Sequence, residues 1–429
     1  MPIRKEAGSS TGVIDVPGPR VQLNGHEPQV PAKATVMLLR LLRAAQPISR
    51  AELARRVGVN RSTVTDAFKQ LIAASVVREE PAEQPAPGAN RALGRPALAL
   101  SFNDEYGYFV GVNVGVRRST VGLATLTGRV IAEEEFETPP EPSDALALIR
   151  ATITKHCTRA RGPRLRAIGV SVPGLADAAR EKIVYAPHLG WQDVDVAGAL
   201  RFDSGGAPCL AGERVRVVVE NDATASALYE LRLRLGRDES ERLDDFVLLR
   251  SGTGLGVGLV LGGEVFRGDA IGEGLAGEFG HMTIVAGGKP CVCGNRGCWE
   301  RYASAPAAAA LYMGERMQMG GQTAPRFVEI VARAEGGELR AQRTLERVGE
   351  YLGIGIGNVI TGLGVTRVIV SGRLVYGWKF MREQINNAVA QSMAGRLHGW
   401  SVEPGEATGA GLGGALEVAA EGFITSGLV

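Results

Sequence analysis

Residues 277–300 of the chain read GEFGHMTIVAGGKPCVCGNRGCWE. In this stretch His281 precedes the spacing Cys-x-Cys-x4-Cys, which is formed by Cys291, Cys293 and Cys298. One imidazole and three thiolates are a donor set that holds zinc (Zn2+) tetrahedrally, and four protein ligands leave the ion no open position. The spacing therefore predicts a structural zinc loop at residues 281–298. The alternative is that three buried thiols lie near an unrelated histidine.

The composition around this loop is typical of a soluble globular protein. Of the 429 residues, 45% are hydrophobic and 22% are charged. The chain contains no run of 18 apolar residues, and its start, MPIRKEAGSS, lacks the apolar segment of a secretory signal. Cys157 and Cys209 stand alone, so the clustering of the other three cysteines favours a metal over disulfides. We expect a cytoplasmic protein that does not enter a membrane.

The length of the chain predicts two or three domains, and the charge distribution separates them. Residues 31–100 carry eleven Lys or Arg against five Asp or Glu, whereas residues 101–429 are net negative. A basic module on an acidic body indicates that one domain faces phosphate groups. We predict a disordered tail at residues 1–30, a DNA-binding domain at 31–102 and a body at 103–429.

The segment after Pro31 shows the pattern of three short helices. Ser49 and Glu52 have the spacing of a capping box, and Gly58 is suited to end the second helix. Two short helices joined by Gly58-Val59-Asn60 are typical of a helix-turn-helix, whose second helix enters the major groove with its N-terminal residues. The predicted DNA contacts on that helix are Arg61, Ser62, Thr63, Thr65 and Lys69.

Two apolar stretches after these helices, at residues 76–78 and 97–100, predict the strands of a wing. Between them Gly94-Arg95-Pro96 presents an extended arginine that suits a narrow minor groove, so Arg95 is a further predicted DNA contact. The domain is then a winged helix-turn-helix. Its positive charge favours DNA binding over the alternative that it binds a protein or only caps the body.

The body alternates strands and helices in the pattern of an α/β fold. Strands are expected at residues 108–114, 119–126, 130–136, 167–172, 215–220, 246–250 and 257–261, and helices at 143–161 and 222–235. A strand with a glycine-containing turn opens each half of the body. This similarity predicts a duplicated α/β unit whose two lobes enclose a cleft, where ligands usually bind.

Polar residues at the ends of these elements are candidates for the ligand site. Asn221 and Asp222 follow a buried strand and begin a helix, where a carboxylate can act as a base on a hydroxyl group or merely cap the helix. Glu278 and Glu300 flank the zinc loop, as hydroxyl acceptors or as solvated surface residues.

A glycine-rich stretch, SGTGLGVG at residues 251–258, follows another strand. Its alternate glycines, Gly252, Gly254 and Gly256, allow backbone amides to approach a phosphate closely. In a hairpin the same glycines can serve only tight packing, so this signal is weak by itself.

Residues 277–281 together with 291–300 closely resemble the signature of the ROK family (repressor, open reading frame, kinase). The Gly94-Arg95-Pro96 wing is similar to that of its repressor branch, which includes xylose and N-acetylglucosamine repressors, and the resemblance extends from Ala32 to the carboxyl terminus. It implies an actin-like, sugar-kinase-type α/β body of two lobes, with a sugar-binding domain at residues 103–429.

The resemblance also implies roles for the candidate residues. His281 would contact both zinc and sugar, Glu278 and Glu300 would accept hydrogen bonds from sugar hydroxyls, and Asn221 and Asp222 would form the far wall of the sugar site. In family kinases the residue matching Asp222 is the catalytic base. The family's second phosphate loop is matched by Gly252, Gly254 and Gly256.

The chain departs from the family kinases at their first phosphate loop. Where they carry Asp-x-Gly-Gly-Thr, this chain has Asn113-Val114-Gly115-Val116-Arg117. The side chain of Val116 obstructs the backbone approach that a phosphate needs, and Asn113 cannot help to neutralise magnesium. His188 replaces an asparagine that usually touches sugar. We expect a protein that retained the sugar site and lost the kinase activity.

The function that follows is a sugar-responsive transcriptional regulator, acting as a repressor of carbohydrate metabolism genes. Its expected partners are a double-stranded DNA operator and a sugar or sugar derivative. We expect a homodimer or higher homo-oligomer, because helix-turn-helix proteins usually read two half-sites. One alternative is an ATP-dependent sugar kinase with an accessory DNA-binding domain, which Asp222 and the Gly252 loop favour. Another is a zinc-stabilised scaffold that binds a second protein.

Overall fold

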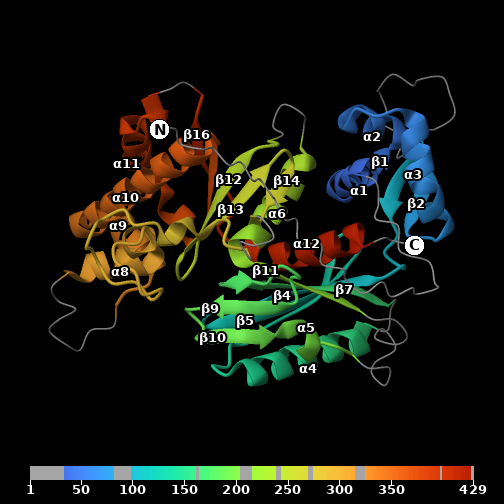
Figure 1. The fold of residues 1–429 in the computed structure, drawn as a ribbon, viewed down its shortest axis with the longest axis horizontal. Coiled ribbons are helices and arrows are strands. Elements are labelled where there is room, and N and C mark those ends of the chain that lie inside the picture. Colours follow the sequence, from blue (N-terminus) through green and yellow to red (C-terminus); the bar gives the residue numbers. More distant parts are fainter. Residues whose placement is uncertain are drawn as a thin grey trace, which may run out of the picture.

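A small N-terminal domain (blue) and a two-lobed α/β body make up the structure, a computed structural model (Figure 1). The predicted tail at 1–30, Arg95 and the predicted wing tip lie outside the described residues. Among the helices that are described, none has the length and apolar composition to cross a bilayer. The described ranges are 33–81, 98–160, 164–202, 215–237, 243–268, 274–314, 324–396 and 399–426.

The N-terminal domain is a winged helix-turn-helix, as predicted. The two wing strands β2 and β3 pair antiparallel. β3 also pairs with β1, a two-residue strand that is too short to leave a hydrophobic pattern and was not predicted. The elements are α1 (Lys33–Ala45), β1 (Ile48–Ser49), α2 (Arg50–Val57), α3 (Arg61–Ala73), β2 (Val77–Pro81) and β3 (Leu98–Phe102).

Helix α2 begins and ends at its predicted caps. Ser49 Oγ accepts a hydrogen bond from Glu52 N at 3.1 Å, and Gly58 ends the helix with a φ of 75°, which favours glycine. Only this half of the predicted capping box is seen, since the Glu52 carboxylate bonds Arg55 and Arg56 instead. The connection to α3 is therefore as short as a helix-turn-helix requires.

The first lobe is built on a five-stranded sheet with the order β11-β7-β4-β5-β6. The strands β4, β5 and β6 form an antiparallel meander. The strands β7 and β11 extend the sheet beyond β4 and run parallel to it. The bounds are β4 (Tyr108–Asn113), β5 (Arg118–Thr125), β6 (Val130–Glu137), α4 (Pro142–Ala160), β7 (Leu165–Val172) and β11 (Arg216–Asn221). A small sheet and a short helix complete this lobe, with β8 (Leu175–Ala176), β9 (Lys182–Ala186), β10 (Trp191–Asp195) and α5 (Val196–Ala199).

The second lobe repeats this plan with the order β14-β13-β12-β15-β16. An antiparallel meander again comes first, and two parallel strands follow. The predicted duplication of an α/β unit is therefore confirmed. The bounds are β12 (Phe246–Ser251), β13 (Leu255–Leu261), β14 (Glu264–Phe266), β15 (Arg367–Gly372) and β16 (Ser401–Pro404), with α7 (Glu300–Ala303), α8 (Ala305–Met313), α9 (Phe327–Glu335), α10 (Leu339–Leu363) and α11 (Trp378–Gln391).

Two helices, α6 (Asp222–Leu235) and α12 (Ala410–Thr425), lie between the lobes (Figure 1). Helix α12 packs on β4 and β7 of the first sheet, α6 packs on β12 and β13 of the second, and the helices pack on each other. Glycines allow this close approach. A Cβ at Gly169 of β7 would lie 2.1 Å from Ala415 O of α12, and one at Gly258 of β13 would lie 2.6 Å from Ala223 O of α6.

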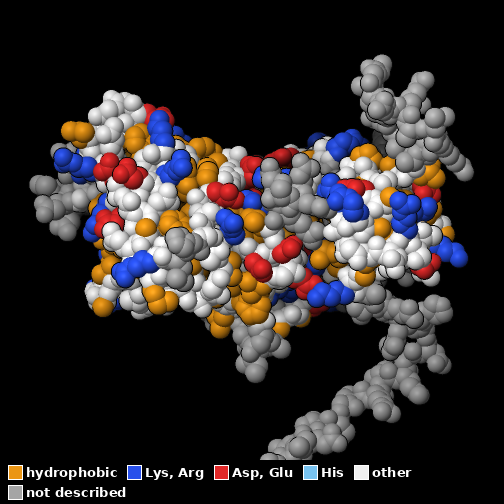
Figure 2. Space-filling model, turned by 90° about the horizontal axis from the view of Figure 1, so that it is seen from above, with side chains coloured by type: hydrophobic (Ala, Val, Ile, Leu, Met, Phe, Trp, Pro, Cys, Tyr) orange, Lys and Arg blue, Asp and Glu red, His pale blue; other side chains and the backbone are white. Residues whose placement is uncertain are grey.

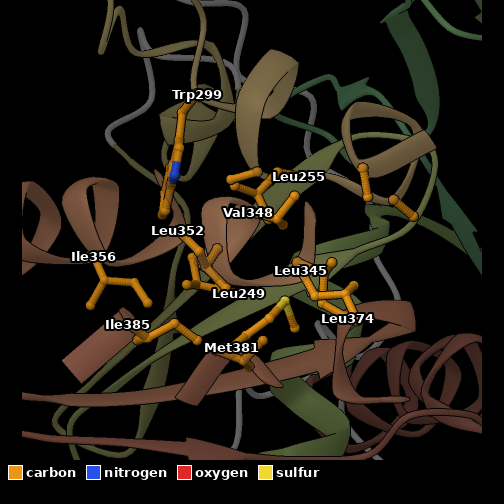
Figure 3. Close-up of a cluster of buried hydrophobic side chains, with 14 of the residues drawn as sticks. Leu249, Leu255, Trp299, Leu345, Val348, Leu352, Ile356, Leu374, Met381 and Ile385 are labelled. Atoms are coloured by element: carbon orange, nitrogen blue, oxygen red, sulfur yellow. The ribbon is translucent and has the colours of Figure 1, made fainter. Parts of the chain in front are cut away.

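The largest apolar core lies in the second lobe, between its sheet and its helices. Figure 3 shows Leu249 of β12, Leu352 of α10 and Met381 of α11 facing one another there, beside Trp299. Trp299 is fully buried, and its Nε1 donates to Tyr351 O at 2.9 Å. Because Trp299 follows Cys298 directly, this core anchors the end of the predicted zinc loop.

Two glycines of α10 allow this packing to be tested. A Cβ at Gly355 would lie 2.0 Å from the Trp299 ring, whereas one at Gly362 would meet no atom within 4 Å. We expect Gly355→Ala to destabilise the fold by about 1–3 kcal/mol through overpacking. Gly362→Ala, the matched control, should stabilise it by about 0.5–1 kcal/mol through helix propensity. Thermal unfolding midpoints measure both, and equal midpoints for the two variants would contradict the expectation.

Candidate zinc loop and carboxylate cluster

The four predicted metal ligands come together in the structure. The ligand atoms of His281, Cys291, Cys293 and Cys298 all lie within 4.8 Å of one another. Cys293 Sγ and Cys298 Sγ are 3.7 Å apart, and Cys291 Sγ is 3.5 Å from His281 Nδ1. A tetrahedral ion with zinc–sulfur bonds of about 2.3 Å places its sulfur ligands about 3.8 Å apart. The arrangement is therefore compatible with a structural zinc ion.

The loop closes through tight backbone turns at glycines. Gly294 and Gly297 have φ values of 89° and 80°, a region that favours glycine. A Cβ at Gly297 would lie 1.8 Å from Val285 O, so no side chain fits there. Gly297 N donates to Lys289 O at 2.9 Å, and Thr283 pairs with Cys298 in a single antiparallel bridge. These turns bring Cys291 and Cys298 to the same point without a regular element.

Glu300, the first residue of α7, joins this loop to the first lobe. It is 5% exposed, and its Oε1 lies 3.0 Å from Cys291 Sγ and 3.9 Å from His281 Nδ1. Its Oε2 lies 3.5 Å from Nε2 of His188, which follows β9. The nearby carboxylate of Glu300 raises the pKa of His188. Glu300 is therefore buried, and the alternative prediction that it is a solvated surface residue is wrong.

Glu278 and Asp222 lie near Glu300 and form with it what we call the carboxylate cluster (Asp222, Glu278 and Glu300). Burial, together with the negative charges of Asp222 and Glu300, raises the pKa of Glu278 to about 7. His281 Nε2 lies 3.7 Å from Glu278 Oε2, on the side of the ring opposite the cysteines. One imidazole thus contacts the predicted zinc ligands through Nδ1 and the carboxylate cluster through Nε2.

Asn221 and Asp222 occupy the junction of β11 and α6, as predicted. Asn221 Oδ1 accepts from Ala223 N at 2.8 Å and Thr224 N at 3.3 Å, and Asn221 Nδ2 donates to Gly174 O at 3.1 Å. Asn221 therefore caps the helix, which was the alternative to ligand contact at this position. Its contact with a ligand stays a prediction.

The partner of Asp222 was missed by the sequence analysis. Arg250 Nε donates to Asp222 Oδ2 at 3.0 Å, and Arg250 Nη1 donates to Ser226 Oγ at 3.0 Å. Arg250 is the only charged residue in β12, FVLLRS, whose other side chains are buried. A charge inside an apolar strand is a signal that a buried partner exists, but only the fold shows that the partner is Asp222.

The glycines of the predicted phosphate loop have different surroundings. A Cβ at Gly254 would lie 2.4 Å from Glu300 Oε2 and 3.1 Å from His188 Nε2, and one at Gly256 would lie 2.8 Å from the Cβ of Ala223. A Cβ at Gly252 would meet nothing within 4 Å. Tight packing thus accounts for Gly254 and Gly256, the alternative named for this stretch, and phosphate binding stays a prediction.

In the N-terminal domain, α3 presents one polar and one apolar face. Val64, Phe68 and Leu71 are buried and hold α3 on the domain. Figure 2 shows Lys and Arg side chains (blue) over the surface of this domain, at the right of the view. The predicted DNA contacts on α3 are all exposed, namely Arg61, Ser62, Thr63, Thr65 and Lys69.

Comparison with known proteins agrees with both parts of the chain. The ROK family model matches residues 109–421, and a model described as winged helix-turn-helix DNA-binding matches residues 33–78. The xylose repressor of Bacillus subtilis is 30% identical over 84% of this chain and 87% of its own length. The DNA-binding transcriptional dual regulator NagC of Escherichia coli is 28% identical over 87% of this chain and 88% of its own length.

Solved structures share the fold. A ROK family transcriptional regulator, a homologue of the Escherichia coli MLC protein, superposes with a TM-score of 0.72 at 24% identity, covering 92% of this chain and 97% of that one. A ROK family glucokinase from Streptomyces griseus, solved with glucose and AMPPNP, covers 73% of this chain and 99% of its own, with a TM-score of 0.58 and 25% identity. The family model spans more than half of the chain and the xylose repressor aligns along most of it, so the chain belongs to the ROK family.

Proposed function

We propose that this chain is a cytoplasmic, sugar-responsive transcriptional repressor of carbohydrate metabolism genes. Residues 31–102 bind operator DNA in this proposal, and residues 103–429 bind a sugar. The observation that carries it is the combination, in one chain, of an exposed recognition helix α3 with a ROK body that gathers the carboxylate cluster beside His281. The xylose repressor and NagC, which align with this chain over both domains, support it.

The carboxylate cluster has the chemistry that a sugar requires. Sugar hydroxyls both donate and accept hydrogen bonds, and carboxylates bound to them serve as acceptors. Asp222, Glu278 and Glu300 supply acceptors here, and His188 and His281 supply ring nitrogens. Asn221, which caps α6, stands at the wall of this site. His188 Nε2 lies 3.5 Å from Glu300 Oε2. We propose that His188 contacts the sugar in the place of the asparagine that other family members carry there.

The first phosphate loop supports a site that binds a sugar without phosphorylating it. A base that removes a proton from a hydroxyl needs a free carboxylate oxygen within hydrogen-bonding reach. In this chain Arg250 holds Asp222 Oδ2 at 3.0 Å, which leaves Oδ1 as the one oxygen that can act on a hydroxyl. At the first phosphate loop Asn113 and Val116 replace the residues that a kinase needs.

The second candidate is a sugar kinase, which the likeness to the Streptomyces griseus glucokinase and the presence of Asp222 favour. An ADP-release assay with D-glucose, D-xylose and N-acetyl-D-glucosamine separates the two. We expect no ADP release above the rate without sugar. Turnover that is present in the wild type and abolished by Asp222→Ala would establish the kinase instead.

The predicted DNA contacts of α3 are tested by gel-shift titration with DNA from upstream of the protein's own gene. The double variant Arg61→Ala, Lys69→Ala should bind at least about tenfold more weakly, because each base or phosphate contact contributes about 1–3 kcal/mol. Arg326→Ala is the matched control, since Arg326 is an exposed arginine on the body, and should bind like the wild type. If the wild type does not prefer this DNA to a random duplex at moderate salt, the repressor proposal fails.

The zinc loop is proposed to hold one structural Zn2+ through His281, Cys291, Cys293 and Cys298. Metal analysis of the pure protein should find about one zinc per chain, and Cys298→Ser should remove most of it and lower the unfolding temperature. Cys157→Ala in α4 alters a buried cysteine remote from the loop and should leave the zinc content unchanged. Zinc-free wild-type protein with normal stability would refute this assignment.

We further propose that the protein acts as a homodimer or higher homo-oligomer. One recognition helix makes few base contacts, and two half-sites bound together raise operator affinity through effective concentration. Sedimentation of the full chain tests the oligomeric state.

A further inference from the structure

The N-terminal domain is packed directly against the body. Helix α1 contacts both α6 and α12. The apolar core of the domain, which includes Leu38 and Leu42 of α1, is continuous with Ala420 and Phe423 of α12. Such a contact can transmit a displacement in the body, because packed side chains shift together with their neighbours.

Arg43 of α1 makes the central polar contact of this interface. Its Nε and Nη2 donate to the two oxygens of Glu417 of α12, each at 2.9 Å, and its Nη1 donates to Leu126 O at the end of β5. Arg43 is 4% exposed, and its guanidinium also lies over the Phe109 ring, 5.4 Å from the centroid. A bidentate pair that is buried in this way fixes orientation as well as distance.

Glu417 is shared with a second arginine from a different part of the molecule. Arg232 Nε of α6 lies 2.9 Å from Glu417 Oε1, the same oxygen that accepts from Arg43 Nη2. Helix α12 packs on the sheet of the first lobe, and α6 packs on the sheet of the second. Glu417 is therefore a point at which the DNA-binding domain and both lobes are in contact.

A second pair repeats this arrangement one turn along both helices. Arg40 of α1 forms a two-bond ion pair with Glu421 of α12, and its Nη1 lies 3.9 Å from Glu264 of β14 in the second lobe. The backbones also approach closely, since a Cβ at Gly236 after α6 would lie 2.6 Å from Ala44 O in the last turn of α1. The domain thus contacts both lobes at once.

The other ends of α6 and α12 lie at the proposed ligand site. Asp222, a member of the carboxylate cluster, is the first residue of α6. Gly411 in the first turn of α12 packs against Asn113 in the segment that matches the kinase phosphate loop. Helix α6 has 14 residues and is about 21 Å long. A ligand that shifts one lobe on the other acts at the first turn of α6, whereas Arg232 lies in the last turn of α6 and Glu417 at the middle of α12.

Solvent reaches the Arg232 side of the contact, since the Arg232 side chain is 25% exposed while those of Arg43 and Glu417 are buried. A small crevice lies between α1, α6 and α12, and Arg43, Arg232 and Glu417 are among the residues that line it. An ion pair beside water separates at a lower cost than one sealed in a core, because water solvates the released charges.

We propose that Glu417 is the positioning residue that couples the angle between the lobes to the position of the DNA-binding domain on the body. When the lobes move, α6 slides on α12 and Glu417 cannot keep both Arg43 and Arg232. Loss of either contact changes how α1, and with it α3, is held. This inference rests on the proposed function only for its ligand and its DNA, since the coupling itself is a property of the apo chain.

Hydrogen exchange of the full-length protein tests the coupling without sugar or DNA. Arg43→Met should speed exchange of residues 33–45 and 412–425 by at least about tenfold, since it leaves Glu417 partly unpaired. Arg232→Met should speed exchange of residues 33–45 by about threefold or more, although Arg232 belongs to α6. Lys379→Met, the control, breaks an exposed pair with Glu335 on the second lobe and should change neither region.

A double-mutant cycle shows whether the effect of Arg232 passes through Glu417. In a Glu417→Gln background, Arg232→Met should produce no further change at residues 33–45. The proposal is overturned if Arg232→Met leaves α1 unchanged in the wild-type background, or if it speeds α1 equally in both. Circular dichroism identifies a variant that fails to fold, and Arg43→Lys, which keeps the charge and loses the two-bond geometry, then replaces Arg43→Met with the same expected direction.

A second arm uses D-xylose, D-glucose and N-acetyl-D-glucosamine with the duplex from upstream of the gene. Arg232→Met should bind sugar as the wild type does, but the change in DNA affinity caused by sugar should fall at least about threefold. An unchanged sugar effect overturns the coupling. A wild type that binds no DNA overturns the proposed function instead, and the exchange experiment still decides the role of Glu417.

Discussion

The buried carboxylate of Glu300 contacts the zinc loop with one oxygen and His188 of the first lobe with the other. Its position depends on Gly254, because a side chain there would overlap the carboxylate, and on the core around the neighbouring Trp299. The predicted zinc loop therefore has a second role besides holding residues 281–298 in a closed loop. By fixing His281 and Glu300 it places two polar groups at the point where the lobes meet, and the proposed sugar site follows from that placement.

A family that includes kinases and regulators raises the question of what distinguishes them. In our proposal the difference is local. The junction of β11 and α6 retains Asp222 at the start of a helix, but Arg250 from the neighbouring lobe holds one of its oxygens. The same ion pair also ties α6 to β12, so Asp222 is part of the contact between strand and helix.

Much of the fold could be predicted from short-range signals. Ser49 and Gly58 marked α2 because caps act through the nearest backbone groups, and the apolar runs of β4 and β12 marked strands buried on both faces. The gathering of the four proposed zinc ligands was predictable because three of the four lie within eight residues. The pairs of Asp222 with Arg250 and of Glu417 with Arg43 were not, because they join residues 28 and 374 positions apart and only the packing of the lobes brings them together. The strand β1 was missed because two residues carry no periodicity.

The continuity of the apolar core from α1 into α12 has a practical meaning for protein engineering. Chimaeric sensors are often made by joining the DNA-binding domain of one regulator to the ligand-binding domain of another at the connecting segment. In this architecture such a cut would divide a single apolar core. It would also leave Arg43 facing whatever residue the new module carries in the place of Glu417. A functional chimaera has to transfer the DNA-binding domain together with the face of α12 that packs on it. The part to exchange is therefore the interface and not the domain alone.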